Sequence, residues 1–308
     1  MGMKKILSAF TALACGIAFS AYPVASQTVE VQTESSVASQ TSEAQIKPFA
    51  VMRTAEVDFP FLSGKTGVLI VDRWKEDTLK ELLNIAYRSK IGKLEYADSF
   101  LTCLSMLKSG KADFFLTCDA TAKYVAERNS DLKYVICDDH RALVMVLRPS
   151  DAALRDTLNA AIKKLGDSGK IAELYNKFVR DLPAGQEPDM AKLEKIHGAE
   201  TVYVGVSGDV PPFDYIAADG KPAGYNVALL GEISKLIGKN IEIVSLNSQA
   251  RYAALESKKI DVFFVSAVAV IKESVAILNS IPEEKEFNKK FIFTEPHHFY
   301  VSGILLKK

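Results

Sequence analysis

The stretch that decides the fold is residues 202–230, VYVGVSGDVPPFDYIAADGKPAGYNVALL. It opens with an apolar run over 202–206 that is typical of a buried strand, and it then passes through two turns rich in Pro, Gly and Asp. A helical pattern follows over 226–237 and ends at Gly238. This strand, turn and helix form the opening unit of an α/β domain, yet they begin two thirds of the way along the chain. The upstream half therefore has to supply the rest of the fold.

Strands and helices alternate through the remaining sequence. The expected strands cover residues 66–71, 93–96, 112–117, 132–137, 241–246 and 260–265, and the expected helices lie around 79–86, 99–108, 121–128, 150–166 and up to 257. Ser150 is expected to cap the helix that Gly166 ends. Such alternation predicts an α/β fold in which helices cover both faces of a mostly parallel sheet.

An internal repeat indicates two similar halves. The positions Leu107, Ser109, Lys111, Asp113 and Phe115 recur with the same spacing as Leu255, Ser257, Lys259, Asp261 and Phe263. In both places the end of a helix is expected to turn into a buried strand. We therefore expect two lobes, each with one such unit.

The motifs carry a resemblance to a known family. The strand over 202–206, the Pro-Pro-Phe that follows it and the Gly-Lys-Pro-Ala-Gly turn resemble the first lobe of the family-3 extracellular solute-binding proteins, the two-lobe type II periplasmic clamps of amino-acid transport. Residues 64–179, with LKSGKADFFLT at 107–117 and GDSGKIAELYNKFV at 166–179, resemble the second lobe and the closing helices. The family order is first lobe, second lobe, closing helix. The resemblance thus implies a circularly permuted clamp, and a fragment of two tandem domains is the alternative.

This reading divides the chain into six segments. They are a signal peptide over 1–26, a flexible leader over 27–48, a second-lobe-like domain over 49–148, closing helices over 149–182, a linker over 183–200 and a first-lobe-like domain over 201–308. The strand that crosses between the lobes is expected at 49–53 and again at 300–306, one version at each end. Because a split crossing strand can pair within one chain or between two, a domain-swapped homodimer stays open.

The N-terminus predicts export. Lys4 and Lys5 precede an apolar run over 6–19, and small residues at 24–26 offer a cleavage site before Gln27. We expect a periplasmic or extracellular protein, with lipid attachment at Cys15 as the alternative. The chain holds 38 basic and 38 acidic residues, a balance that argues against nucleic acid as a partner.

The sequence offers no metal or cofactor motif. Cys103, Cys118 and Cys137 remain after export, so at most one pair can form a disulfide, and the sequence does not choose it. Their spacing fits no zinc site, and the adjacent His297 and His298 are expected on the surface.

Ligand contacts are expected in the loops at the carboxyl ends of the strands, because open α/β sheets bind ligands there. These loops place Asp209, Ser266 and Thr117 at the cleft. The resemblance implies that an aromatic residue near the Pro-Pro-Phe turn packs on the ligand, and Phe213 and Tyr215 stand at that place.

The sequence departs from the family at several ligand positions. The family's carboxylate-binding Arg is missing after the strand at 260–265, Asp72, Arg73 and Trp74 replace its Gly-Thr-Thr, and Cys118 replaces its carboxylate with Asp119 one place later. Either the cleft is altered, with Arg73, Trp74, Arg251 and Asp119 as new contacts and Trp74 as a stacking platform, or it has lost binding and survives as a scaffold.

These features lead to three functional hypotheses. The first is a non-catalytic protein that closes two lobes over a small polar, amino-acid-like solute and delivers it to a membrane ABC permease. The second is an exported sensory or scaffold module. The third is an enzyme, because dehydratases of cyclohexadienyl compounds share the clamp fold. Glu232, Glu256 and Glu295 are acids by type only, and nothing brings two of them together, so we expect no catalysis.

Overall fold

The computed structural model describes residues 59–70, 74–183, 185–186, 190, 193–247, 250–269 and 282–308. All of them lie in the compact unit Pro48–Lys308. The expected signal peptide and leader, the crossing segment expected at 49–53, and the candidates Asp72 and Arg73 lie outside the described residues. No helix in the described part is long and apolar enough to cross a membrane.

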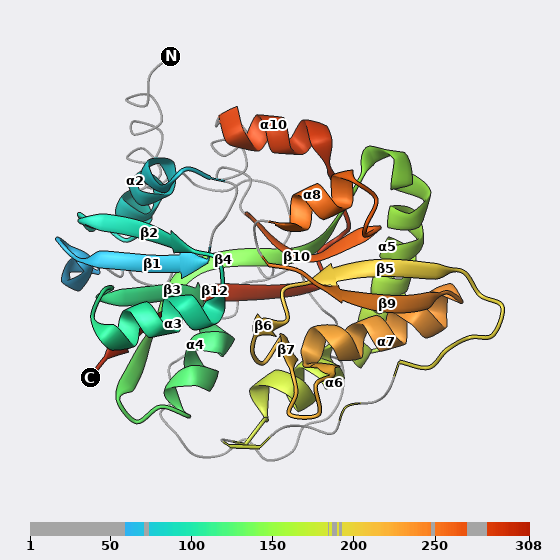
Figure 1. Cartoon of the computed structure of the whole chain (residues 1–308), viewed down its shortest axis with the longest axis horizontal. Coiled ribbons are helices and arrows are strands. Elements are labelled where there is room, and N and C mark those ends of the chain that lie inside the picture. The colour runs from blue at the N-terminus through green and yellow to red at the C-terminus, as the bar shows by residue number, and fades with distance from the viewer. Residues whose placement is uncertain are drawn as a thin grey trace, which may run out of the picture. The chain divides into compact units, whose positions relative to one another are not determined.

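A nine-stranded sheet runs through the described residues (Figure 1), with the order β2-β1-β3-β12-β4-β10-β5-β9 and with β11 beside β4. The strands are β1 (Thr66–Ile70), β2 (Lys93–Ala97), β3 (Phe114–Cys118), β4 (Leu132–Leu147), β5 (Thr201–Val206), β9 (Asn240–Ser245), β10 (Val262–Ala269), β11 (Ile292–Phe293) and β12 (His298–Lys307). A separate small sheet contains β6 (Asp209–Val210), β7 (Asp214–Ile216) and β8 (Pro222–Ala223). The α/β class and the strands expected in both halves are confirmed.

The sheet holds two parallel groups joined by antiparallel strands. The first strand group is β1, β2 and β3, and the second strand group is β5, β9 and β10. Between them, β12 pairs antiparallel with both β3 and β4, and β4 pairs antiparallel with β10. The long strands β4 and β12 thus belong to both groups.

Strand β4 is much longer than the sequence indicates, because it continues ten residues beyond the expected end at Cys137. Asp138, Asp139, His140 and Arg141 interrupt the apolar pattern there. The pairing of β4 with β12 has an irregularity between Ile136 and His140 and then resumes, and pairing with β10 begins at Arg141. Backbone pairing on both sides of the polar residues, together with the burial of residues 142–147, therefore sets the length of the strand.

Helices cover both faces of the sheet (Figure 1). They are α2 (Glu76–Ala86), α3 (Phe100–Ser109), α4 (Asp119–Ala126), α5 (Ala152–Asp167), α6 (Lys170–Tyr175), α7 (Tyr225–Ile237), α8 (Ala250–Glu256) and α10 (Pro282–Lys290), with short helices η1 (Pro60–Leu62), η2 (Pro149–Asp151) and the π-helix η3 (Asn176–Arg180). Successive residues of β3 point to opposite faces of the sheet. Phe114 shares a core with Leu83 of α2, whereas Phe115 shares another core with Leu107 of α3. This is the alternation that a covered sheet requires.

The second strand group is built in the same way. Phe264 packs in a core with residues of α5 and α7, and its neighbour Phe263 packs in a core with residues of α8 and α10. Gly238 takes the left-handed conformation after α7, as expected. Ser150 does not cap α5, because it lies in η2 and bonds to the side chain of Asp151, and α5 begins at Ala152.

The internal repeat corresponds to one local structure formed twice. Asp113 precedes β3, and its carboxylate accepts a hydrogen bond of 2.8 Å from the backbone N–H of Thr66 at the start of β1. Asp261 precedes β10 and accepts one of 3.0 Å from Tyr203 in β5. Each aspartate therefore aligns its strand with the neighbouring parallel strand, so the repeat has a structural role.

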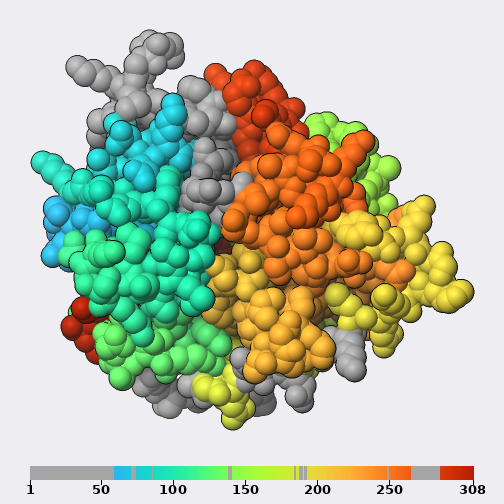
Figure 2. Space-filling model, in the orientation of Figure 1, coloured from blue at the N-terminus to red at the C-terminus, as the bar shows by residue number. Residues whose placement is uncertain are grey.

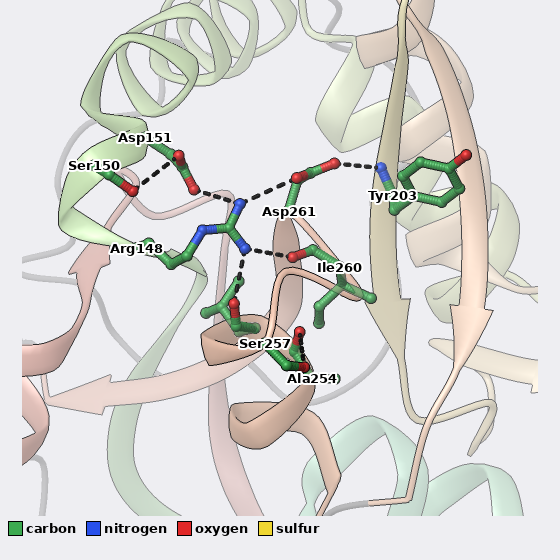
Figure 3. A network of polar contacts seen from close by, with 9 residues as sticks. Arg148, Ser150, Asp151, Tyr203, Ala254, Ser257, Ile260 and Asp261 are labelled. Atoms are coloured by element: carbon green, nitrogen blue, oxygen red, sulfur yellow. Dashed lines mark hydrogen bonds and ion pairs between the residues drawn. The ribbon is translucent and has the colours of Figure 1, made fainter.

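Arg148 at the end of β4 fixes this long strand to the second strand group (Figure 3). Its guanidinium donates to the carbonyl oxygens of Leu255 at 2.8 Å and Ile260 at 2.6 Å. It also pairs with Asp261 at 3.1 Å and Asp151 at 2.6 Å. Because only 12% of the side chain is exposed, these partners replace water around a charged group.

Candidate functional site

The strand registers bring the carboxyl ends of both groups to one place. The end of β3 lies beside the middle of β12, where Cys118 is opposite Ser302, and Gly303 is opposite Ile136 of β4. From the other direction β10 ends with Ala269 opposite Arg141 of β4. The carboxyl ends of β3 and β10 therefore approach each other over the middle of β4 and β12. Open α/β sheets bind ligands at such a position.

The loop after β5 is fixed by a buried carboxylate. Asp214 accepts hydrogen bonds from the hydroxyl of Ser207 at 2.6 Å, the backbone of Gly208 at 2.7 Å and the amide of Asn226 at 2.7 Å. Burial raises the pKa of Asp214, and these three donors oppose the rise. Gly224 is required nearby, because its φ is +105° and a Cβ would lie 2.5 Å from the carbonyl oxygen of Phe213.

Asp209, in the same hairpin, reaches the first strand group. Its carboxylate accepts a hydrogen bond of 2.8 Å from the backbone N–H of Phe100, the first residue of α3. Figure 2 shows the surfaces of the two groups, blue to green and yellow to orange, meeting on this face. The predicted cleft residue Asp209 thus lies where the groups meet, and its contact is with the protein itself.

Four aromatic rings form a cluster beside this hairpin. The ring of His298, at the start of β12, stacks on Tyr175 with centroids 4.3 Å apart and lies 5.8 Å from both Phe213 and Tyr225. Tyr225 is fully buried, and within the described residues its hydroxyl has no hydrogen-bond partner. The Nε2 atom of His298 is also buried and has no hydrogen-bond partner within the described residues. The cluster therefore presents two buried polar atoms whose hydrogen bonds are not satisfied.

The expectation that His297 and His298 lie on the surface was wrong for His297, whereas His298 is half-buried. His297 is 2% exposed and stacks on Phe264 with centroids 4.8 Å apart. Burial lowers the pKa of His297 to about 3 and that of His298 to about 4. Both imidazoles are therefore neutral near pH 7. The sequence hides this because the pair follows polar residues, whereas tertiary packing encloses it between β4 and the aromatic cluster.

A cavity of about 170 Å³ adjoins the start of α4. It lies between α4 and the segment that follows α6, and its lining includes Asp119, Tyr124, Arg128, Tyr175, Arg180 and Leu182. Burial, followed by the charges of Asp119 and Cys118, raises the pKa of Tyr175. Tyr175 therefore connects the aromatic cluster to the first residues of α4, where Asp119 was predicted to contact a ligand.

Two predicted contacts serve packing instead. Trp74 is 7% exposed and packs with Leu79 and Leu83 in the core under α2, so the prediction of a stacking platform was wrong. The hydroxyl of Tyr96 donates a hydrogen bond to the backbone carbonyl oxygen of Trp74 and helps to hold the indole in this core. Arg251 places its guanidinium over the ring of Phe263, 5.0 Å from the centroid, which indicates a packing role against the second strand group.

The other predicted residues lie in or beside the strands and differ in exposure. Thr117 is the last but one residue of β3 and lies opposite Gly303, and Ser266 lies within β10, where its side chain is outside the described part. Phe213 is 3% exposed and Tyr215 is 9% exposed. Phe213 is therefore a core residue as well as a wall of the aromatic cluster. Sequence reasoning missed Tyr175, Tyr225 and His298, although the position of Tyr225 directly after the Gly-rich turn could have indicated it.

The cysteines are free thiols in the described part of the chain. Burial raises the pKa of Cys103 to about 12 and that of Cys118 to about 11, so both stay protonated near neutral pH. Among the residues that the structure describes, no group of three or more His, Cys, Asp or Glu side chains could hold a metal ion.

Comparison with known proteins identifies the class of the C-terminal part. Residues 202–308 match the model of a family described as bacterial extracellular solute-binding proteins, family 3. The resemblance seen in the sequence is thereby confirmed for the part of the chain that begins at β5. The matched part includes the hairpin of Asp209, the strand β10 and the start of β12.

Two similar proteins are named as binding proteins. The L-cystine-binding protein TcyJ of Escherichia coli K12 is 30% identical over 122 residues, which are 39% of this chain and 40% of that protein. A probable amino-acid ABC transporter-binding protein of Haemophilus influenzae is 26% identical over 115 residues, 37% and 39% of the two chains. The chain thus matches about two fifths of the length of these relatives. The expectation of a non-catalytic protein agrees with all three descriptions.

A solved ligand-binding component of an ABC-type import system from Staphylococcus aureus aligns with 79% of this chain and 65% of its own. The identity is 15% and the TM-score 0.41, which does not by itself establish a shared fold.

Proposed function

We propose that this protein is an exported, non-catalytic solute-binding protein. It would close its two strand groups over a small polar, amino-acid-like solute and present the solute to a membrane ABC permease. The observation that carries the proposal is that the carboxyl ends of β3 and β10, one from each strand group, approach each other over the middle of β4 and β12. The family match over 202–308 supports it, as do the names of the two relatives, one an L-cystine-binding protein and the other a probable amino-acid ABC transporter-binding protein.

The chemistry of the cluster suggests what part of the solute it would hold. An Arg that could grip a carboxylate is missing from residues 262–272. The starts of β12 and α7 instead offer Nε2 of the neutral His298 imidazole and the hydroxyl of Tyr225, two buried atoms that are unsatisfied among the described residues. Such groups suit an uncharged polar group better than a carboxylate. Asp119 at the start of α4 would face an ammonium group.

The domain order supports circular permutation. The first strand group and β4 precede the closing helices, and β12, the last strand, returns between β3 and β4. The chain would then correspond to a family member opened after its crossing strand. A gene reordered to begin at residue 201, with residue 308 joined through a linker to residue 59, should yield a folded protein with the same solute preference. A reordered chain that fails to fold would count against the permutation.

One observation favours the scaffold alternative, in which the cleft has lost its solute. Phe213 and Trp74, both predicted to contact a ligand, are core residues. A domain-swapped dimer is the alternative to a monomer, because β12, the last strand, lies in the middle of the sheet and can pair within one chain or between two. Light scattering after size-exclusion chromatography would distinguish monomer from dimer.

The test is a thermal-shift screen of the protein from Gln27 onward against amino acids, polyamines, small carboxylates and short peptides, followed by calorimetry on any hit. A hit should weaken at least tenfold in Tyr225→Phe, which removes only the hydroxyl, and in Asp119→Asn. Asp219→Asn serves as the matched control, because Asp219 is exposed and bonds only to Lys221 among the contacts of the described chain. A well-folded sample that no solute stabilises would reject transport in favour of a scaffold.

A further inference from the structure

The contact between Asp209 and α3 joins parts of the chain that are 109 residues apart. Asp209 belongs to the hairpin after β5, where it pairs with Tyr215 in the small sheet. Phe100 belongs to the core of the first strand group, where its ring lies 5.3 Å from that of Phe115. The hydrogen bond therefore connects a rigid part of one group to a rigid part of the other.

The acceptor and donor are well suited to each other. Helix α3 has ten residues, and its first N–H groups carry partial positive charge that favours a carboxylate. Ser99 already caps the helix by accepting from the backbone N–H of Thr102 at 3.1 Å. Asp209 adds a second acceptor by binding the N–H of Phe100, the first residue of the helix. A charged acceptor makes such a bond stronger than one between neutral groups.

The other charges around Asp209 do not favour its ionised form. The neighbours that influence it are the carboxylates of Asp214 in β7 and Asp98 before α3, and Asp209 in turn influences the thiol of Cys103 in α3. Burial, and then these carboxylates, raise the pKa of Asp209, while the N–H of Phe100 opposes the rise. The positive end of α3 is thus the group that stabilises the Asp209 anion in this position.

We propose that Asp209 is a latch that holds the two strand groups together when no solute is bound, through its hydrogen bond to the start of α3. This inference rests on the proposed function, since a latch matters only if the groups separate to admit a solute. Opening about β4 and β12 would break the bond, whereas pairing along those strands would persist. Removing the carboxylate should therefore shift the solute-free protein towards an open state.

Spin labels on the outer ends of the two groups would test the latch. Lys111 and Lys259 occupy matching places in the internal repeat, and both are exposed. They can be replaced by cysteine and labelled while Cys103 and Cys137 stay buried, with the unsubstituted protein measuring any labelling of Cys118. Double electron–electron resonance then gives the distance distribution between the groups without any solute.

The wild-type protein should give one narrow distribution. Asp209→Ala should give a longer and broader one, and Asp209→Asn, which keeps an acceptor without charge, should fall between them. The matched control is Asp219→Ala, which removes an exposed carboxylate ten residues further along the chain and should leave the distances unchanged. A distribution for Asp209→Ala equal to that of the wild type, in a sample with unchanged circular dichroism, would overturn the latch.

A second arm separates this inference from the proposed function. If a solute is found, adding it should restore the narrow distribution in Asp209→Ala, because the solute then bridges the groups instead. If Asp209→Ala opens the protein and no solute closes it, the latch stands and the transport function fails. If a solute binds but Asp209→Ala was never open, the function stands and the latch fails.

Discussion

Replacing the two buried histidines should remove most of the acid sensitivity of this protein between pH 7.5 and pH 5. The perturbation is His297→Phe combined with His298→Phe. Neither replacement breaks a side-chain hydrogen bond among the described residues, since both ring nitrogens of His297 and Nε2 of His298 lack partners. The aromatic neighbours Phe264 and Tyr175 can stack on phenyl rings instead.

The sign follows from the lowered pKa values of the folded state. An unfolded histidine binds a proton near pH 6.5, whereas His297 binds one only near pH 3 and His298 near pH 4. The stability that their neutral burial allows is therefore complete above pH 6.5 and is lost as the pH falls below it. At pH 5 each histidine favours the unfolded chain by about 2 kcal/mol, which gives about 4 kcal/mol for the pair.

Urea unfolding followed by circular dichroism at pH 7.5, 6.5 and 5.0 measures this effect. The wild-type free energy of unfolding should fall by about 4 kcal/mol more than that of the double variant. The raised pKa values of Asp209 and Asp214 act in the opposite direction, but they are common to both proteins and cancel in the comparison. His197→Gln is the control, because His197 is exposed. Equal pH dependence in the wild type and the double variant would refute the reasoning.

Two further predictions concern stability. Arg148→Met should lower the free energy of unfolding by about 3 kcal/mol, because it leaves Asp261 and two carbonyl oxygens without the guanidinium that donates to them. The control is Arg155→Met, which should change this free energy by less than about 0.5 kcal/mol. A small loss for Arg148→Met would contradict its anchoring role. Lys258 and Gly110 occupy matching positions in the two copies of the repeat, and both have a positive φ, +60° and +77° respectively. In urea titrations, Lys258→Gly should raise the free energy of unfolding by about 0.5 kcal/mol, and Gly110→Ala should lower it by about 1 kcal/mol. Equal signs for the two changes would contradict this.

The order of elements could be predicted from the sequence because local patterns carry it. The apolar period of each strand, the stripe of each helix and the glycine at Gly238 act over a few residues, and the structure agrees with them. The internal repeat could also be seen, since both copies keep the Asp that aligns two parallel strands. The resemblance to solute-binding proteins rests on the same kind of short motif, and the family match confirms it over 202–308.

Only the location of the site could be predicted from the sequence. Strand-end rules placed Asp209, Thr117 and Asp119 at the edge where the two groups meet. They could not reveal that Asp209 bonds to α3, because its partner is 109 residues away. Nor could they separate a ligand platform from a core residue, since the burial of Trp74 depends on packing under α2.

The sequence by itself thus determined the α/β class, the two halves and the position of the loops between them, because these follow from interactions between near neighbours in the chain. The tertiary structure alone decided the continuation of β4 beyond the polar residues at 138–141, the burial of His297, and the contact of Asp209 with Phe100. Each of these depends on which distant segments share a sheet or a core. Backbone pairing and desolvation at such contacts outweigh the local preference of the residues involved.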